Sequence, residues 1–277
     1  MTEWTHFSLV AETDRLWRVM FDSPPINLVT PEMLVELPRL VDGMERASAL
    51  RVVVFESANP DYFLNHYDTS RVAETPKELG VTGFPLVIDA GTRLSRLPVV
   101  SIAKIRGRVR GVGSELAQAM DMRFASKRAW FGQPETANGN LPGAGGLEHL
   151  PRLMGRARAL EVALSSDDYP GELAERYGWV NRTVDDADLD GLVDTLARRI
   201  ASFDKESIAA VKRQVDRYTL PSAEDIKSSY DIYFDSFAWP GSRRRLPAAL
   251  AAGRNRAGDY EARLGYHLGR QPQGDGS

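Results

Sequence analysis

The start of the chain carries two short runs of apolar and polar positions with β-type patterning. Phe7 to Ala11 and Leu16 to Phe21 lie on either side of turn-prone Glu12-Thr13-Asp14. Ser23-Pro24-Pro25 follows the second run. The pattern predicts an opening β-hairpin that ends at these prolines.

A helical pattern follows the prolines. Thr30 is a suitable N-cap, Pro31 fits the first helical position and Glu32 lies in the first turn. Apolar residues then recur at helical spacing at Leu34, Leu37, Val41 and Met44. The segment is predicted to form an amphipathic helix packed on a sheet.

Strand and helix patterns then alternate. We expect a strand over Arg51 to Glu56, a helix over Phe84 to Leu97 and a strand over Val99 to Ile105. This alternation implies right-handed crossovers and a mostly parallel sheet. The predicted fold class is therefore α/β.

The second half of the chain becomes mainly helical after two more short strands, Met122 to Ala125 and Ala129 to Gly132. From Gly146 onward helical patterns dominate, including Leu189 to Phe203 and Glu206 to Tyr218.

Residues 222–277 carry less information. They contain an Ala-rich stretch that predicts a helix from Leu246, and residues 271–277 are expected to be disordered.

Composition excludes several classes of function. The 35 basic and 38 acidic residues give a net charge of -3, so we expect no nucleic-acid partner. The absence of cysteine rules out disulfides, thiolate nucleophiles and Cys-based zinc sites. The four histidines lack metal-site spacing, so no metal is expected.

Targeting signals are not evident in the sequence. Residues 1–6 lack a positive region followed by an apolar core, and no apolar run approaches the roughly 18 residues that span a bilayer. We therefore expect a cytoplasmic protein without membrane contact.

Two glutamates lie in segments whose backbone suits an active site. Glu115 follows Gly111-Val112-Gly113-Ser114, and a helix expected over Ser114 to Met120 would leave amides at its start free to stabilise an oxyanion. Glu135 ends Phe131-Gly132-Gln133-Pro134-Glu135, and Gly-rich 142–146 can fold the chain back toward Glu115. Paired carboxyl groups suggest acid and base catalysis.

Other readings of the same glycines are weaker. The run lacks the third glycine of a dinucleotide fingerprint, and Ser114 is not in a Gly-x-Ser-x-Gly elbow. Neither a nicotinamide enzyme nor a serine hydrolase is favoured.

These motifs resemble the crotonase, or enoyl-CoA hydratase/isomerase, superfamily in order and spacing. Further matching segments are Val19 to Leu28, Arg51 to Phe55 and Gly178 to Arg182. The resemblance covers about residues 10 to 215, and several separated motifs in order are more specific than one glycine motif.

The resemblance implies a crotonase-like spiral of ββα units over residues 1–200 and a C-terminal helical region over residues 201–277. In the family this region covers the acyl pocket and contacts neighbouring subunits, so a homotrimer or a dimer of trimers is expected. Coenzyme A is expected as part of the substrate, with no separate cofactor.

The resemblance also implies roles for individual residues. Glu115 and Glu135 match the two glutamates that handle water and proton, while Tyr67 and Val112 match the residues whose backbone amides form the oxyanion hole. The residues that match positions binding CoA or substrate are Leu64, Asn65, His66, Asp68 and Gly111. The activity expected first is hydration of a 2-enoyl-CoA.

Some residues depart from the family pattern. Residues 61–68 are bulky where small residues are usual, and Val112 replaces a usual glycine, which a β-branched residue tolerates only at negative φ. Arg108 and Arg110 either bind a phosphate or carboxylate or form ion pairs at the surface or at a subunit interface. Other enolate chemistry (isomerisation, decarboxylation, C–C cleavage or cyclisation) or a non-catalytic oligomeric scaffold stays open.

Overall fold

The computed structural model describes residues 4–270 and contains two sheets. The larger sheet has six strands in the order β1-β2-β3-β5-β7-β10. Their bounds are β1 (Phe7–Ala11), β2 (Leu16–Phe21), β3 (Val52–Ser57), β5 (Val100–Ile105), β7 (Met122–Ser126) and β10 (Arg182–Val184). β1 and β2 pair antiparallel as the predicted hairpin, and every other pair is parallel.

The smaller sheet has four strands in the order β4-β6-β8-β9. They are β4 (Tyr62–Leu64), β6 (Arg108–Arg110), β8 (Trp130–Gly132) and β9 (Asp168–Pro170), and only β8 and β9 pair antiparallel. β8 was expected from the sequence. The other three were not, because a segment of three residues seldom shows a clear period of two. The mixed, mostly parallel architecture confirms the predicted α/β class.

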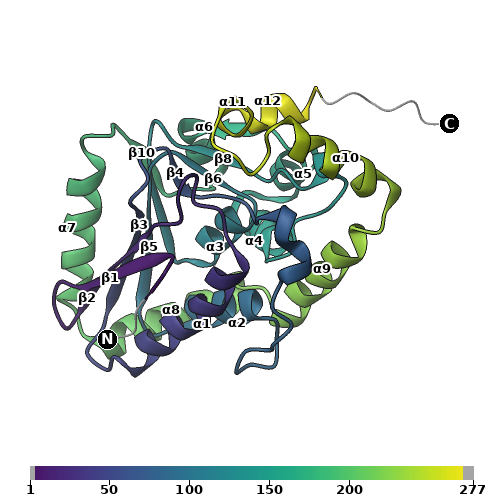
Figure 1. The fold of residues 1–277 in the computed structure, drawn as a ribbon. Helices are drawn as coiled ribbons and strands as arrows, with labels where there is room; N and C mark the ends of the chain where they lie inside the picture. Colours follow the sequence, from purple (N-terminus) through teal and green to yellow (C-terminus); the bar gives the residue numbers. More distant parts are fainter. Residues whose placement is uncertain (1–3, 271–277) are drawn as a thin grey trace.

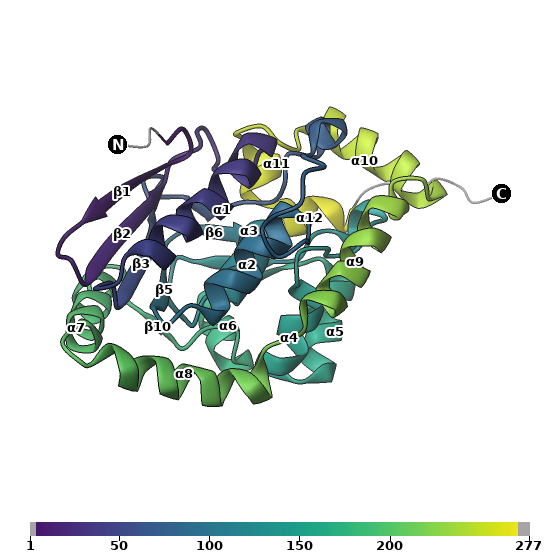
Figure 2. The ribbon, with the colours of Figure 1, turned by 90° about the horizontal axis from the view of Figure 1, so that it is seen from below.

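Helices connect and cover the strands (Figures 1 and 2). In the first two thirds they are α1 (Pro31–Arg46), η1 (Thr69–Glu74), α2 (Leu86–Arg96), α3 (Val112–Ala119), η2 (Thr136–Asn138), α4 (Gly146–Met154), α5 (Arg156–Ser165) and α6 (Gly171–Tyr177). Thr30 caps α1 as predicted, and its hydroxyl accepts from the amide of Met33 at 3.2 Å. α3 begins at Val112 rather than at Ser114.

The larger sheet is buried on both faces, which explains its continuous apolar runs. Val53 and Phe55 join the main core with α1 and α2. Val52 and Val54 face the other way and pack with Leu189 of α7 (Leu189–Ala201). The expected division at residue 200 falls in the last turn of α7.

The C-terminal helices wrap one side of the core (Figure 1). They are α8 (Lys205–Thr219), α9 (Ala223–Ser236), α10 (Pro240–Ala252), α11 (Asp259–Ala262) and α12 (Leu264–Leu268). The Ala-rich helix expected from Leu246 is α10, which starts six residues earlier because Pro240 supplies a favourable first helical residue. The disorder expected at 271–277 falls outside the described residues.

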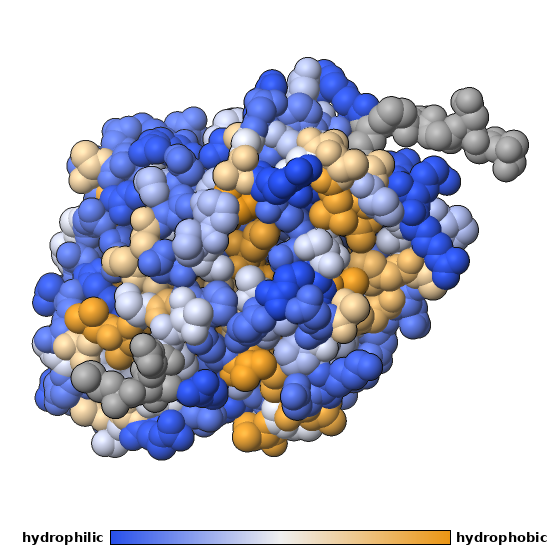
Figure 3. Space-filling model, in the orientation of Figure 1, coloured by the Kyte–Doolittle hydropathy of each residue, from blue (hydrophilic) through white to orange (hydrophobic). Residues whose placement is uncertain are grey.

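Apolar surface gathers over α9 and α10 on one face of the molecule, beside a hollow (Figure 3). Tyr230 and Phe234 of α9 and Leu246 of α10 line a pocket here. Across residues 4–270, none of the helices has both the length and the apolar character needed to cross a bilayer.

Candidate active site

Gly111 brings three functional segments together. It precedes α3 with φ 51° and ψ -133°, a conformation open essentially only to glycine. A Cβ at this position would lie 2.7 Å from Oε1 of Glu135 and 2.8 Å from Cβ of His66. The backbone here can therefore approach both residues only because it has no side chain.

Gly113 anchors the start of α3 on β4. A Cβ there would lie 2.2 Å from the carbonyl oxygen of Leu64, and its amide donates to the carbonyl of Asn65 at 3.2 Å. This contact fixes the position of Val112 next to the segment that carries Tyr67.

Glu115 is buried in the first turn of α3. Its Oε1 accepts from the backbone amides of Ala144 and Gly146, both at 2.8 Å, so the Gly-rich bend does fold back onto this residue. Burial and the charge of Glu135 raise the pKa of Glu115, while the two amide donors oppose the rise.

Glu135 lies between β8 and η2. Its Oε2 is buried and has no hydrogen-bond partner within residues 4–270. Burial raises the pKa of Glu135, and the nearby guanidinium of Arg254 opposes the rise. Burial raises the pKa of both glutamates, and the charge of Glu135 further raises the pKa of Glu115, which favours a shared proton near neutral pH.

Two backbone amides beside the pair are available to a ligand. In the described part of the chain, the amides of Tyr67 and Val112 donate to no protein group, although their neighbours Asp68 and Gly113 donate to carbonyls at 2.9 and 3.2 Å. Val112 is helical and is not among the residues with positive φ, so its β-branched side chain is tolerated.

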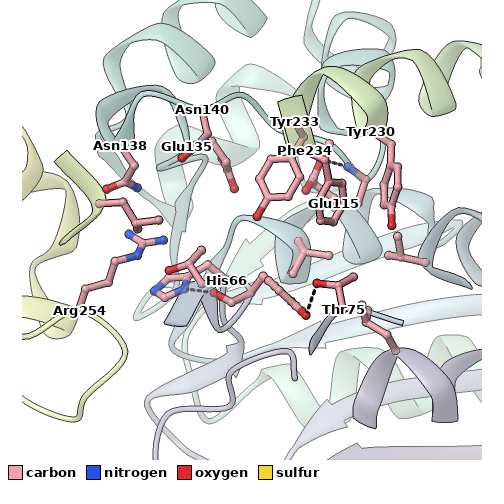
Figure 4. Close-up of a pocket in the computed structure, with 18 residues that line it drawn as sticks. His66, Thr75, Glu115, Glu135, Asn138, Asn140, Tyr230, Tyr233, Phe234 and Arg254 are labelled. Atoms are coloured by element: carbon pink, nitrogen blue, oxygen red, sulfur yellow. Dashed lines mark hydrogen bonds between the residues drawn. The ribbon is translucent and has the colours of Figure 1, made fainter. Parts of the chain in front are cut away.

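These groups open into one pocket with a cavity of about 60 Å³ (Figure 4). Its apolar walls come from Leu34 of α1, Val87 of α2, and Tyr230 and Phe234 of α9. Its polar lining includes His66, Thr75, Glu115, Glu135, Asn138, Asn140, Tyr233 and Arg254. An apolar cavity with few converging polar groups is typical of a small-molecule site.

The remaining residues expected to bind CoA or substrate are placed differently. His66 lines the pocket, whereas the side chains of Leu64 and Asn65 are fully buried. Asp68 caps η1 and accepts from Nδ2 of Asn255 at 2.6 Å. Leu64 and Asn65 can therefore offer a ligand little beyond their backbone.

The polar atoms of His66 and Tyr67 are bonded to residues other than the two glutamates. The Tyr67 hydroxyl pairs with Thr75 Oγ1 at 2.8 Å. His66 Nε2 lies 2.9 Å from Glu261 Oε1, and burial lowers the pKa of His66. Burial alone would raise the pKa of Glu261, but His66 and Arg254 hold it well below its usual range.

Arg108 and Arg110 form structural contacts. Arg110 is buried and makes two 2.7 Å bonds to Asp168, and its Nη1 donates to the carbonyl of Glu261. Arg108 donates to the carbonyl of Ala262 and lies over the ring of Tyr62. Arg110 therefore forms an ion pair, but inside the chain rather than at the surface or a subunit interface as the sequence suggested.

Sequence reasoning missed several pocket residues, namely Asn138, Asn140, Tyr233 and Arg254. The last two come from the C-terminal helical region, and no local motif marks them. Within residues 4–270, no group of three or more His, Asp or Glu residues is arranged to hold a metal ion.

The comparisons with known proteins agree with this arrangement. Residues 12–235 match the model of the enoyl-CoA hydratase/isomerase family, so the chain belongs to that family, which is the crotonase superfamily. The resemblance seen in the sequence motifs is confirmed, and the chain is an enzyme of the crotonase type.

Individual relatives show how wide the family is. The short-chain-enoyl-CoA hydratase of Clostridium acetobutylicum is 28% identical over 69% of this chain and 74% of its own length. The 1,2-epoxyphenylacetyl-CoA isomerase of Escherichia coli is 27% identical over 74% and 80%. The crystal structure of a candidate enoyl-CoA hydratase from Streptomyces avermitilis has a TM-score of 0.92 and 37% identity, covering 98% of this chain and 99% of its own.

Proposed function

We propose that this enzyme hydrates a 2-enoyl-CoA thioester to the 3-hydroxyacyl-CoA. The observation that carries the proposal is the placement of two buried carboxyl groups in one small pocket with two unpaired backbone amides. Hydration needs an oxyanion stabiliser, a base for water and an acid for the α-carbon, and these groups supply all three. Membership of the family supports the same chemistry.

In the proposed reaction the thioester oxygen accepts from the amides of Tyr67 and Val112. Glu115 takes a proton from water as the water oxygen bonds to the β-carbon, and the electrons of the double bond shift to the thioester oxygen. The resulting enolate collapses as Glu135 gives its proton to the α-carbon. Water is added overall, and one proton then returns from Glu115 to Glu135 to restore the pair.

Hydrogen bonding supports this division of roles. Burial and the charge of Glu135 raise the pKa of Glu115, but the two amides that donate to its Oε1 oppose this rise and fix its direction, so Glu115 can act as the base once it is ionised. Glu135 Oε2 has no partner in the described part of the chain, so a proton on it is free to be donated to substrate.

Isomerisation of the double bond is the second candidate. It needs the same oxyanion hole, with one carboxyl group removing a proton and returning it at another carbon. The unpartnered Oε2 of Glu135 suits such a role, and the Escherichia coli relative is an isomerase.

Product identity separates these functions. Crotonyl-CoA and a 3-enoyl-CoA are incubated with the enzyme, and products are identified by mass spectrometry. We expect 3-hydroxybutyryl-CoA from crotonyl-CoA. A moved double bond without added water would favour isomerisation, and recovery of both thioesters unchanged would contradict both candidate activities.

A further inference from the structure

Arg254 presents a guanidinium with unsatisfied hydrogen-bond donors inside the pocket. The residue is 3% exposed, and its Nε and Nη1 are buried without a hydrogen-bond partner. In the described part of the chain, no carboxylate oxygen lies within 4.0 Å of its guanidinium nitrogens. Burying guanidinium N–H groups without acceptors costs free energy. We therefore expect a bound ligand to supply an acceptor that the protein does not.

The acidic residues nearest to Arg254 are engaged or disfavour charge. Glu261 accepts from Asn255 N and Asn65 Nδ2, at 2.9 and 3.2 Å, and pairs with His66. The charged form of Glu135 is disfavoured because burial raises its pKa. The ionised form of Glu261 is favoured by Arg254, but within residues 4–270 neither carboxylate bonds the free donors of the guanidinium.

The backbone holds Arg254 in place. Gly253, with φ 128°, ends α10, and the amide of Arg254 donates to the carbonyl of Ala249 at 3.0 Å. On the other side, Asn255 is bonded to both Glu261 and Asp68. With its turn fixed on both sides, Arg254 points into the pocket beside Asn138, on the same side as His66 (Figure 4).

Asn138 adds a second polar group that lacks a hydrogen-bond partner at this end of the pocket. Its side chain is buried and its Oδ1 has no partner within residues 4–270. Its Nδ2 donates to the carbonyl of Pro134 at 3.0 Å, which fixes the amide. A ligand at this end thus meets a guanidinium donor and an amide acceptor.

We propose that Arg254 binds a carboxylate carried by the acyl group, so that the substrate is the CoA thioester of a dicarboxylic acid. This inference rests on the proposed function. A planar guanidinium matches a carboxylate, and such charge-assisted bonds are the stronger ones in proteins. Arg254 lines the same pocket as Glu115 and Glu135, so a carboxylate bound to it would belong to the part of the substrate that lies beside the two glutamates.

Two unreactive thioesters test this assignment. Pentanoyl-CoA and glutaryl-CoA have the same chain length and differ in a terminal methyl against a terminal carboxylate. Isothermal titration at fixed salt is expected to give glutaryl-CoA a Kd about ten- to a hundredfold lower, as expected for a hydrogen bond to a charged group.

Variants test whether the preference for glutaryl-CoA over pentanoyl-CoA depends on Arg254. Arg254→Met should bring the ratio of the two Kd values close to one, and Arg254→Lys should leave an intermediate ratio because the planar fork is lost. The control Arg256→Gln removes an exposed arginine two residues away, whose Nη2 bonds only the carbonyls of Leu250 and Ala251, and should keep the full preference.

The outcomes separate the inference from the function on which it rests. Binding of pentanoyl-CoA as tightly as glutaryl-CoA by the wild-type enzyme would overturn the role of Arg254 but leave an acyl-CoA enzyme. A preference that survives in Arg254→Met would also overturn it. Binding of neither thioester would remove the proposed function and the inference together.

Discussion

At the scale of single residues, the site depends on positions where the chain has no side chain. Gly111, Gly113 and Gly146 each face an atom that a Cβ would approach to 3.0 Å or closer. For Gly111 and Gly146 the nearby groups include the two glutamates themselves. The sequence pattern indicated turn glycines, and their close contacts explain why no other residue fits.

Gly111→Ala tests this requirement. The backbone strain should cost about 1–3 kcal/mol, and the new methyl group should displace Glu135, so we expect a loss of activity on the order of a hundredfold with a lower Tm. Gly191→Ala is the matched control, since nothing lies within 4 Å of its Cβ position in α7. Equal activity in the two variants would contradict the account.

The pKa of Glu115 makes stability depend on pH. Because burial raises this pKa in the folded state, folding favours the protonated form, and the unfolded chain releases its proton more readily. The stability from protonated Glu115 is full below the unfolded value of about 4.3 and is lost as pH rises through the folded pKa.

Glu115→Gln removes this loss. We expect the Tm of the variant to exceed that of the wild type by an amount that grows from pH 5 to pH 8, with each kcal/mol worth about 2–4 °C. Differential scanning calorimetry measures it, and exposed Glu172→Gln should show no such trend. A Tm difference that shrinks with rising pH would contradict the sign of the shift.

At the scale of elements, the sequence pattern predicted most of the long segments and missed most of the three-residue strands. The hairpin, α1 and the strands β3 and β5 show clear periods, and they form at the expected places within one or two residues. β4, β6 and β9 have three residues each and gain their stability from neighbouring strands. Local pattern cannot reveal pairing that is set by distant segments.

The pocket also combines residues that local motifs predict with residues that only the fold brings in. The candidate site residues Glu115, Glu135, Tyr67 and Val112 were found by motif and lie around one pocket. Arg254 and Tyr233 reach it only because α9 and α10 fold back over the core, and their sequence neighbourhoods show nothing unusual. Residues that lie more than 90 positions apart in the sequence can be recognised as parts of one pocket only when the fold is known.

At the scale of the whole molecule, α8 carries an exposed apolar stripe. Val211, Val215 and Tyr218 are 64%, 53% and 81% exposed and recur at spacings of four and three on one helical face. Such a stripe is typical of a protein interface. It supports the expectation of a trimer or a dimer of trimers, which stays a prediction.

Light scattering after size exclusion checks this prediction. We expect a mass three or six times that of the 30.7 kDa chain, and Val215→Asp should shift the enzyme to smaller species because a charge enters the stripe. Val10→Asp, at an exposed valine of β1, is the control and should keep the wild-type mass. A monomeric wild-type enzyme at micromolar concentration would refute the expected assembly.

The central claim is that Glu115 and Glu135 act together on an enoyl thioester held by the amides of Tyr67 and Val112. The most direct test follows the loss of enoyl-thioester absorbance with crotonyl-CoA for the wild type, Glu115→Gln and Glu135→Gln. We predict hydration by the wild type and a fall of about 10²- to 10⁴-fold in each variant, with unchanged folding by circular dichroism. Wild-type rates in either variant would contradict the assignment of that glutamate to the reaction.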